Sequence, residues 1–165
     1  MKHLLGLLLV MGIVGCADPV AELENLGAKV VRQESEGDAI SVSLYRTWHP
    51  ITDVEVAHLG SLVHLKDLNL INTQITDAGM AHLKALTRLE RLYLTGTRIT
   101  DAGLVHLKEM DNLKTLYLTN TKITGGGLAH CSAMTQMETL WLINTPLTDA
   151  GLAHLTGMTN LKFLY

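Results

Sequence analysis

Residues 75–98 read ITDAGMAHLKALTRLERLYLTGTR, and the same 24-residue pattern recurs without gaps along most of the chain. Five copies can be aligned, and they begin at Ile51, Ile75, Ile99, Ile123 and Leu147. The fifth copy is incomplete and runs to Tyr165. A repeat of this length is typical of a solenoid, in which each unit buries its apolar face against its neighbours.

Each copy combines a strand pattern with a helix pattern. In the second copy, leucines flank Tyr93 on both sides, and this alternation is typical of a strand with one buried face. The T-D-A-G segment carries residues favoured at helix N-termini. Met80, Leu83 and Leu86 then lie on one helical stripe. The sequence therefore predicts an α/β solenoid with parallel strands on its concave face and short helices on its convex face.

The strand segment carries a recognisable motif, L-x-x-L-x-L-x-x-T, which runs from Leu89 to Thr97 in the second copy. This motif resembles the leucine-rich repeat, in which Asn or Cys more often stands at the place of the threonine. Residues 51–165 carry the resemblance and look like the short-repeat bacterial members of that family. The resemblance implies a recognition module that binds through its concave face.

The repeated threonines and one cysteine are expected to belong to the scaffold. The threonine hydroxyls should satisfy backbone groups in the turn after each strand, where buried polar groups must be paired. This ladder comprises Thr73, Thr97, Thr121 and Thr145. Cys131 takes the place of a core leucine, which predicts a buried free thiol.

The amino terminus has the layout of a secretory signal. Residues 1–15 combine Lys2 with an apolar run that is too short to span a bilayer. Residues 13–16, Ile-Val-Gly-Cys, resemble the lipobox of bacterial lipoproteins, in which cleavage before the cysteine is followed by its acylation. This resemblance implies lipidation at Cys16 and an extracytoplasmic, membrane-anchored protein. An ordinary cleaved signal, with an incidental cysteine, is the alternative.

Residues 16–50 differ in composition from the repeats, which predicts a linker and an amino-terminal cap. The cap should contain a helix that ends at Gly27, followed by a hairpin around the turn at residues 35–38. No comparable cap follows the fifth copy at residues 147–165. The chain is therefore expected to be a fragment lacking further repeats, or to be covered at that end by a partner or a second copy in a homodimer.

The residues between the strand leucines should point away from the core and form the concave surface. One column lies along the middle of the strands: Asn69, Tyr93, Tyr117, Trp141 and Tyr165. A second column lies beside it: Asp67, Arg91, Thr115, Thr139 and Phe163. Tyr45 is expected to begin this surface from the cap strand. Since strands lie about 4.8 Å apart, the four aromatic residues would form a ridge roughly 14 Å long.

This ridge has two interpretations. Aromatic residues are good strand formers that stack across strands, so they could stabilise the sheet without any ligand. Tyr and Trp are also enriched in binding hot spots, and exposed apolar patches of this extent usually mark a contact. We favour binding of a protein or peptide, with a glycan as a further candidate. A structural envelope protein without a specific ligand is the alternative.

A column of histidines recurs on the predicted convex side. His82, His106 and His130 are weak candidates for a metal site, since histidine is the commonest metal ligand. No carboxylate or thiolate recurs beside them in the sequence, and repetition of the whole unit already explains the column. We therefore expect no metal and no cofactor.

Other function classes are disfavoured by composition. A formal charge of −3 offers no basic footprint for nucleic acid. Hydrophobic residues make up 47% of the chain and charged residues only 18%, which excludes disorder. Catalysis needs an irregular cluster of converging groups, whereas nearly every His, Thr and Asp here belongs to the repeat. We expect no enzyme. The triplet at residues 125–127, which replaces Asp-Ala-Gly with three glycines, is either a hinge or sequence drift.

Overall fold

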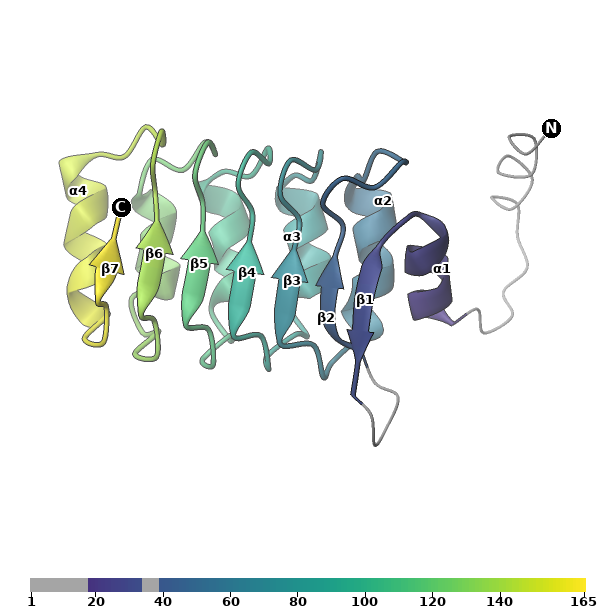
Figure 1. Cartoon of the computed structure of the whole chain (residues 1–165). Coiled ribbons are helices and arrows are strands. Elements are labelled where there is room, and N and C mark those ends of the chain that lie inside the picture. Colours follow the sequence, from purple (N-terminus) through teal and green to yellow (C-terminus); the bar gives the residue numbers. More distant parts are fainter. Residues whose placement is uncertain (1–17, 34–38) are drawn as a thin grey trace.

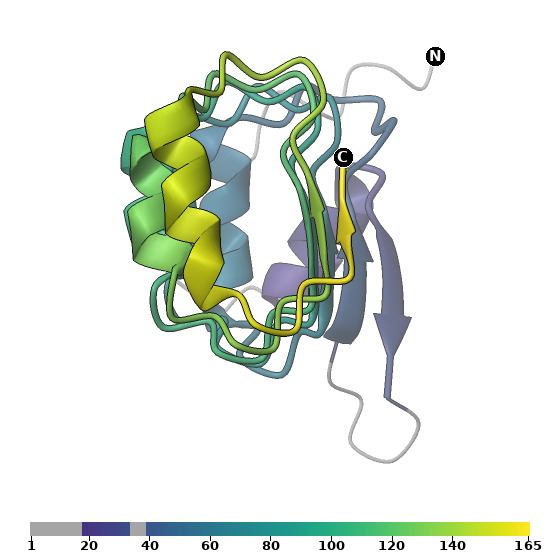
Figure 2. The ribbon, with the colours of Figure 1, turned by 90° about the vertical axis from the view of Figure 1, so that its left-hand side faces the viewer.

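The computed structural model describes residues 18–33 and 39–165, which form a sheet on one side and a row of short helices on the other (Figure 1, Figure 2). This is the leucine-rich repeat architecture that the sequence predicts. We use "concave face" for the side of the sheet turned away from the helices. The predicted signal at residues 1–15, Cys16 and the turn at residues 35–38 lie outside the described residues.

Seven strands in chain order form the described sheet. β1 and β2 are antiparallel, and every later neighbour pairs in parallel. Between repeats the register advances by 24 residues, so Leu68 pairs with Leu92 and Leu92 with Leu116. The strands are β1 (Lys29–Arg32), β2 (Ala39–Ser43), β3 (Asp67–Asn69), β4 (Arg91–Tyr93), β5 (Thr115–Tyr117), β6 (Thr139–Trp141) and β7 (Phe163–Leu164).

The helices are short, and several are 3-10 helices, labelled η. Apart from η1, η3 and η4, each repeat helix begins at a threonine, as at Thr76, whose hydroxyl accepts a hydrogen bond from the N–H of Ala78 at 3.2 Å. This confirms the predicted capping role of the T-D-A-G segment. The helices are α1 (Pro19–Asn25), α2 (Asp53–Val56), η1 (Ala57–Ser61), α3 (Asp77–Leu83), η2 (Asp101–Leu107), η3 (Gly126–Cys131), α4 (Asp149–Leu152) and η4 (Ala153–Gly157).

The core lies between the two layers and is almost entirely aliphatic. Leu92 and Leu94 from β4 and its turn pack with Met80 and Leu83 from α3, all fully buried. The threonine ladder is also as predicted: Thr97 donates its hydroxyl hydrogen to the carbonyl of Leu94 at 2.7 Å. The same bond recurs from Thr73 to Leu70, Thr121 to Leu118 and Thr145 to Leu142.

Aspartates join successive repeats by a contact that the sequence pattern did not reveal. The carboxylate of Asp53 accepts hydrogen bonds from the N–H of Thr76 at 2.8 Å and from its hydroxyl at 2.6 Å. Asp77 bridges to Thr100 in the same way, and Asp101 to Thr124. We call these contacts the Asp–Thr bridges. A glycine follows two residues after Asp77 and after Asp101, and a Cβ on Gly103 would lie 2.6 Å from Oδ1 of Asp77.

The fourth copy interrupts this series, because Gly125 stands where the other copies have aspartate. Its φ of +107° favours glycine, and a Cβ there would lie 2.5 Å from the Cα of Gly151. The glycine therefore allows the fourth and fifth copies to approach closely. Thr148 donates instead to the carbonyl of Thr124, from its N–H at 3.0 Å and from its hydroxyl at 3.2 Å.

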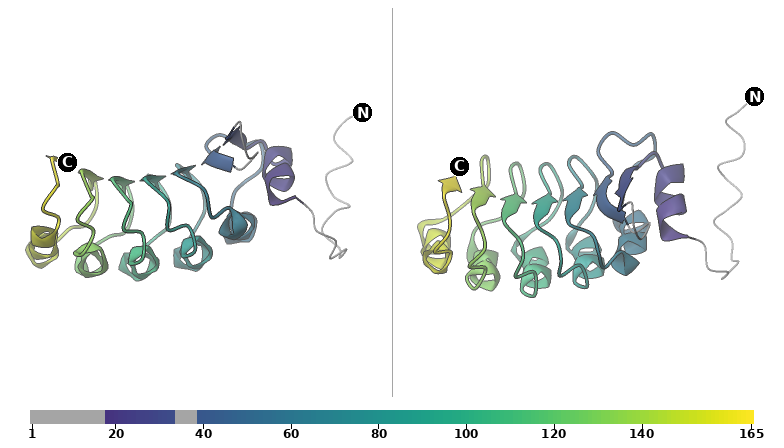
Figure 3. Two further views of the ribbon diagram at one scale, coloured as in Figure 1. Left: turned by 90° about the horizontal axis from the view of Figure 1, so that it is seen from below. Right: turned by 60° about the horizontal axis from the view of Figure 1, so that its bottom comes forward.

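The region before the repeats forms a helix and a hairpin beside the first copy. Nδ1 of His58 in η1 lies 2.7 Å from a carboxylate oxygen of Glu22 in α1, which joins the helix to the repeats. Trp48 packs against Gly27, where an added Cβ would come within 2.7 Å of the indole. Seen along the solenoid, β1 lies farther from the helices than the repeat strands do (Figure 2, Figure 3). In the part of the chain that the structure describes, no helix is both long and apolar enough to span a membrane.

Candidate functional site

The aromatic column, comprising Tyr93, Tyr117, Trp141 and Tyr165, lies on the concave face in the predicted register. Tyr93 pairs with Tyr117, and Tyr117 with Trp141, along adjacent strands. Their ring centroids are 4.9 Å and 5.1 Å apart, and the Tyr117 and Trp141 rings are within 11° of parallel. Trp141 and Tyr165 stack at 4.1 Å. The four rings therefore form a continuous column across the repeats, tilted by 36° between Tyr93 and Tyr117 and stacked from Tyr117 to Tyr165.

This stacking decides which parts of the rings are open to a ligand. The inner rings turn their faces toward one another, so a ligand in front of the sheet meets their edges. Tyr93, Tyr117 and Trp141 are half-buried, whereas Tyr165 is 51% exposed. Burial, reinforced by the nearby charge of Asp67, raises the pKa of the Tyr93 hydroxyl. The column offers a row of ring edges and neutral hydroxyls, which suits hydrogen bonding and van der Waals contact.

The neighbouring column is polar at one end and apolar at the other. Arg91 and Asp67 form a two-pronged ion pair across β3 and β4, with Nη2 of Arg91 2.6 Å from Oδ2 of Asp67. The hydrogen bond that Arg91 donates to the carboxylate of Asp67 raises the pKa of the Arg91 guanidinium. Thr115 and Thr139 are half-buried in the middle of this column, and Phe163 is exposed. The pair neutralises its own charge, which leaves the centre of the concave face uncharged.

Tyr45 does not share the register of the aromatic column. β2 ends at Ser43, and it is Ser43 that pairs with Asn69. The cap strand is joined to the first repeat strand by a longer connection, since Ser43 and Asn69 are 26 residues apart, not 24. Tyr45 therefore follows the strand, and its ring lies 5.4 Å from the guanidinium of Arg46.

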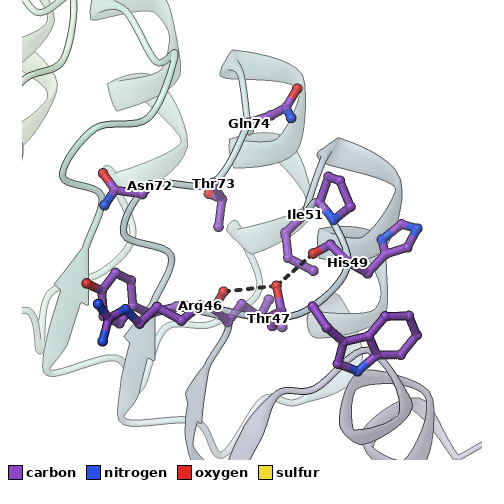
Figure 4. A pocket seen from close by; sticks show the side chains of 11 residues that line it. Arg46, Thr47, His49, Ile51, Asn72, Thr73 and Gln74 are labelled. Atoms are coloured by element: carbon purple, nitrogen blue, oxygen red, sulfur yellow. Dashed lines mark hydrogen bonds between the residues drawn. The ribbon is translucent and has the colours of Figure 1, made fainter.

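Tyr45 instead lines a hollow at the rim of the sheet, which we call the rim hollow. Its volume is about 480 Å³, and Arg46, Trp48 and Asn72 are among the residues that line it. Residues 44–51 form one wall of the rim hollow. Figure 4 shows Thr47 in this segment, and its hydroxyl donates a hydrogen bond to the carbonyl of His49 at 2.7 Å. The rim hollow lies outside the aromatic column.

A second hollow lies on the concave face itself, between the cap hairpin and the first repeat strands. This cap hollow has a volume of about 390 Å³. Tyr93 forms one of its walls, and the small side chains of Ser43 and Asn69 leave the space in front of that ring open. Its lining comprises Lys29, Val31, Ser41, Val42, Ser43, Asp67, Asn69 and Tyr93. The repeat pattern predicts Asp67, Asn69 and Tyr93 on this face, but it does not include β1 and β2, which precede the first repeat.

Charged residues alternate along the edge of the sheet where the strands begin. Glu90 pairs with Lys114 at 2.9 Å, and Glu138 with Lys162 at 3.1 Å. The hydrogen bond from Lys114 lowers the pKa of Glu90, with nearby Lys66 acting in the same direction. This column follows the 24-residue spacing of the sequence. It braces neighbouring repeats on a solvated edge.

The histidine column lies on the convex side, as its position in the repeat implies. His82 is in α3, His106 in η2 and His130 in η3, and each is at least partly exposed. Over residues 18–33 and 39–165, no three His, Cys, Asp or Glu side chains are grouped so that they could hold a metal ion. The regular spacing places the imidazoles in a row without bringing further ligands to them.

Cys131 is buried in η3, as predicted. Burial raises the pKa of its thiol to about 12. A nucleophilic cysteine requires a thiolate at neutral pH, and this environment strongly disfavours one. Cys131 therefore acts as a small core residue in the place that leucine holds in the other copies.

Comparison with known families identifies the repeats. Residues 61–84 match a model described as "Leucine Rich repeat", and residues 87–125 match one described as "Leucine Rich repeats (2 copies)". Comparison with curated protein sequences gives no match. The matched segments contain β3, β4 and β5, of which β4 and β5 carry Tyr93 and Tyr117 of the aromatic column.

Solved structures show the same fold. An internalin (InlF) from Listeria monocytogenes superposes with a TM-score of 0.60 at 25% identity, covering 70% of this chain and 32% of that one. Internalin C2 from the same organism gives 0.63 at 24% identity, covering 89% and 62%. The LRR ectodomain of the receptor kinase SOBIR1 from Arabidopsis thaliana gives 0.54 at 17% identity, covering 89% and 90%. The chain thus spans less than two thirds of either internalin and has the leucine-rich repeat fold.

Proposed function

We propose that this chain is a non-enzymatic recognition module of a bacterial cell envelope and that it binds a protein or peptide on its concave face. The observation that carries the proposal is the aromatic column, which the sheet holds on a face that no helix within residues 18–33 and 39–165 covers. Aromatic residues on a rigid scaffold lose little conformational entropy on binding and are enriched in hot spots. Similarity to internalins and to a receptor ectodomain supports the proposal at the level of the fold.

The centre of this face suits a partner that is neither strongly acidic nor strongly basic. The only charges beside Tyr93 in the neighbouring column belong to Asp67 and Arg91, which neutralise each other. Thr115 and Thr139 add hydroxyl groups beside the rings. A protein or peptide surface with exposed backbone amides and apolar side chains matches these groups better than a polyanion does.

Attachment to the membrane is the second part of the proposal. The lipobox pattern at residues 13–16 supports acylation of Cys16, which would hold the repeats outside the cytoplasm. One acyl chain binds a membrane reversibly, and stable anchoring needs a second signal or a second chain. Mass spectrometry of the protein purified from bacterial membranes tests this: the expected amino-terminal peptide begins at an acylated Cys16. An unmodified Cys16 overturns the anchoring.

The binding proposal is tested by capturing partners from envelope extract with the protein produced from the full-length chain. Thr139→Arg adds a long charged side chain to the concave face without removing a ring, and it should abolish capture. Ala129→Arg is the matched control, because it adds the same side chain on the exposed side of η3. Circular dichroism must first show that both variants fold.

A partner retained by the parent and by Ala129→Arg, but lost by folded Thr139→Arg, supports the concave face as the binding site. Retention by both variants overturns it. The continuous ring stack also favours the structural alternative, in which the rings serve the sheet alone. The triple variant Tyr93→Ser, Tyr117→Ser and Trp141→Ser separates the two, since a purely structural column would lower stability and change no interaction.

A further inference from the structure

The ring stack does not continue to the amino-terminal end of the concave face. Adjacent rings are 4.1 to 5.1 Å apart from Tyr165 to Tyr93, and the next position in register is Asn69, followed by Ser43. Both side chains are too small to carry the stack further. The Tyr93 ring contacts the Tyr117 ring at a tilt of 36°, and Tyr93 also lines the cap hollow.

The cap hollow is bounded on the far side by the hairpin. β1 lies in front of the repeat strands, and its residue Val31 is 46% exposed and lines the hollow. A ring seated above Asn69 would therefore meet Tyr93 on one side. On the other side, across Ser43, it would face the hairpin at Lys29, with Val31 two residues farther along β1. Stacked or edge-on aromatic pairs contribute beyond their buried area, so this space suits an aromatic ring.

Charge adds a second requirement for the ligand. Two charged side chains of opposite sign line the hollow, Asp67 and Lys29. Asp67 is already paired with Arg91. Lys29 is exposed and makes no ion pair with the rest of the described chain. The hollow therefore presents one unpaired cation near the Tyr93 ring, and the group complementary to that cation is a carboxylate.

We propose that the cap hollow is a subsite for a peptide segment in which an aromatic side chain lies next to a carboxylate. The aromatic ring extends the column by one position above Asn69, and the carboxylate pairs with Lys29. The hydroxyls of Ser41 and Ser43 are available to the peptide backbone. This inference rests on the proposed function, because it names what one end of the same concave face recognises.

The test uses N-acetyl-L-tryptophan as a probe of both features, with N-acetyl-L-tryptophanamide as the matched probe that lacks the carboxylate. Binding is followed by NMR on the protein from the full-length chain. The expected result is a shift of the Asn69 side-chain amide and of the Lys29 backbone amide. The amide probe should bind about two- to five-fold more weakly, the range expected for one exposed ion pair. Lys29→Gln should weaken the acid probe by the same factor.

Asn69→Tyr provides the decisive variant, since its ring would occupy the proposed position and exclude the probe. Asn69 also accepts the N–H of Ile71 at 3.0 Å, so folding must be verified first. Val54→Tyr is the control. Val54 is 72% exposed in α2, so this substitution adds a ring away from the concave face. If Asn69→Tyr does not fold, Lys29→Gln and the two probes still decide the question.

Several results would overturn the subsite. The first is equal affinity of the protein for the acid probe and the amide probe, and the second is NMR shifts centred on Tyr165 instead of Asn69. The third is full binding of the probe by folded Asn69→Tyr. The fourth is displacement of the probe by methyl glucoside, which would indicate a sugar site. Partner capture keeps the two proposals apart. If Asn69→Tyr captures every partner that Thr139→Arg loses, the subsite fails and the concave face stands. If the probe binds the hollow but no partner is captured from the extract, the subsite stands and the proposed binding of a protein partner fails.

Discussion

The carboxylate of Asp77 accepts two hydrogen bonds from Thr100 of the following repeat, one from its N–H at 2.8 Å and one from its hydroxyl at 2.7 Å. One side chain thus caps the start of the next helix and fixes its distance from the previous one. Because Asp53 and Asp101 repeat the contact, the Asp–Thr bridges extend along most of the solenoid.

Removing one bridge should destabilise the protein measurably. Asp77→Ala leaves the N–H of Thr100 without its acceptor, and we expect the free energy of unfolding to fall by about 1–3 kcal/mol. Asp149→Ala is the control, because Asp149 also lies in the first turn of a helix but accepts no side-chain hydrogen bond within the described chain. Urea denaturation measures both. Equal losses would show that the bridge contributes nothing beyond a helix-end charge.

The bridges also predict how stability depends on pH. Burial alone would raise the pKa of Asp101, but hydrogen bonds from Thr124, Gly127 and Gly125 outweigh it and hold the pKa below its ordinary value of 3.8. A carboxyl group whose pKa is lower in the folded state stabilises the protein above its unfolded pKa, and that contribution is lost as pH falls through the folded value.

Thermal melts should therefore show a midpoint that is flat above about pH 5 and falls below about pH 4. Glu90 acts in the same direction, since the hydrogen bond from Lys114 lowers its pKa. Asp101→Asn should reduce the slope on the acid side. An unchanged slope in this variant would mean that other carboxyl groups carry the effect.

Restoring the consensus residues of the fourth copy should have opposite effects at adjacent positions. Gly125→Asp places a side chain at φ +107° and against Gly151, so it should destabilise by about 2 kcal/mol or more despite matching the other repeats. At Gly126 an added Cβ would lie 3.7 Å from Asp101, an ordinary contact. Gly126→Ala should be neutral or stabilising by up to about 1 kcal/mol. Chemical denaturation of the two variants decides this, and a stable Gly125→Asp would contradict the close packing.

The thiol of Cys131 should resist alkylation in the native protein. It is fully buried, and burial raises its pKa to about 12. Iodoacetamide at neutral pH should modify it only after denaturation, as followed by mass spectrometry of the peptide that contains it. Thr135→Cys, at an exposed position nearby, provides a thiol that should react at once. Rapid native labelling of Cys131 would mean that η3 opens locally.

The 24-residue periodicity predicts two kinds of contact: those within one repeat, and those between strands that a constant repeat length brings into register. The stacking of Tyr93 on Tyr117 follows from the alternation of side chains along a strand together with a constant 24-residue register. The bond from Thr97 to Leu94 follows from the turn that every copy contains. These features depend on local backbone geometry, which the sequence repeats five times.

Contacts between repeats and at the cap were harder to predict. The repeat pattern predicts Asp77 at the N-terminus of a helix in its own copy, and nothing in one copy shows that its carboxylate reaches Thr100 of the next. The 24-residue count extended back from Asn69 leads to Tyr45, but the connection after the cap is two residues longer and brings Ser43 there instead. The cap hollow was missed for the same reason, since its walls come from a strand outside the repeat.

The absence of an aspartate at position 125 divides the solenoid into a tightly bridged part and a looser one. Between the fourth and fifth copies, the carboxylate bridge is replaced by two hydrogen bonds to the carbonyl of Thr124. In a repeat protein, each boundary between units has its own opening free energy. Backbone amides of the fifth copy should exchange with deuterium faster than those of the second and third, so a partner that spans Trp141 and Tyr165 would slow this exchange and close the boundary as it binds.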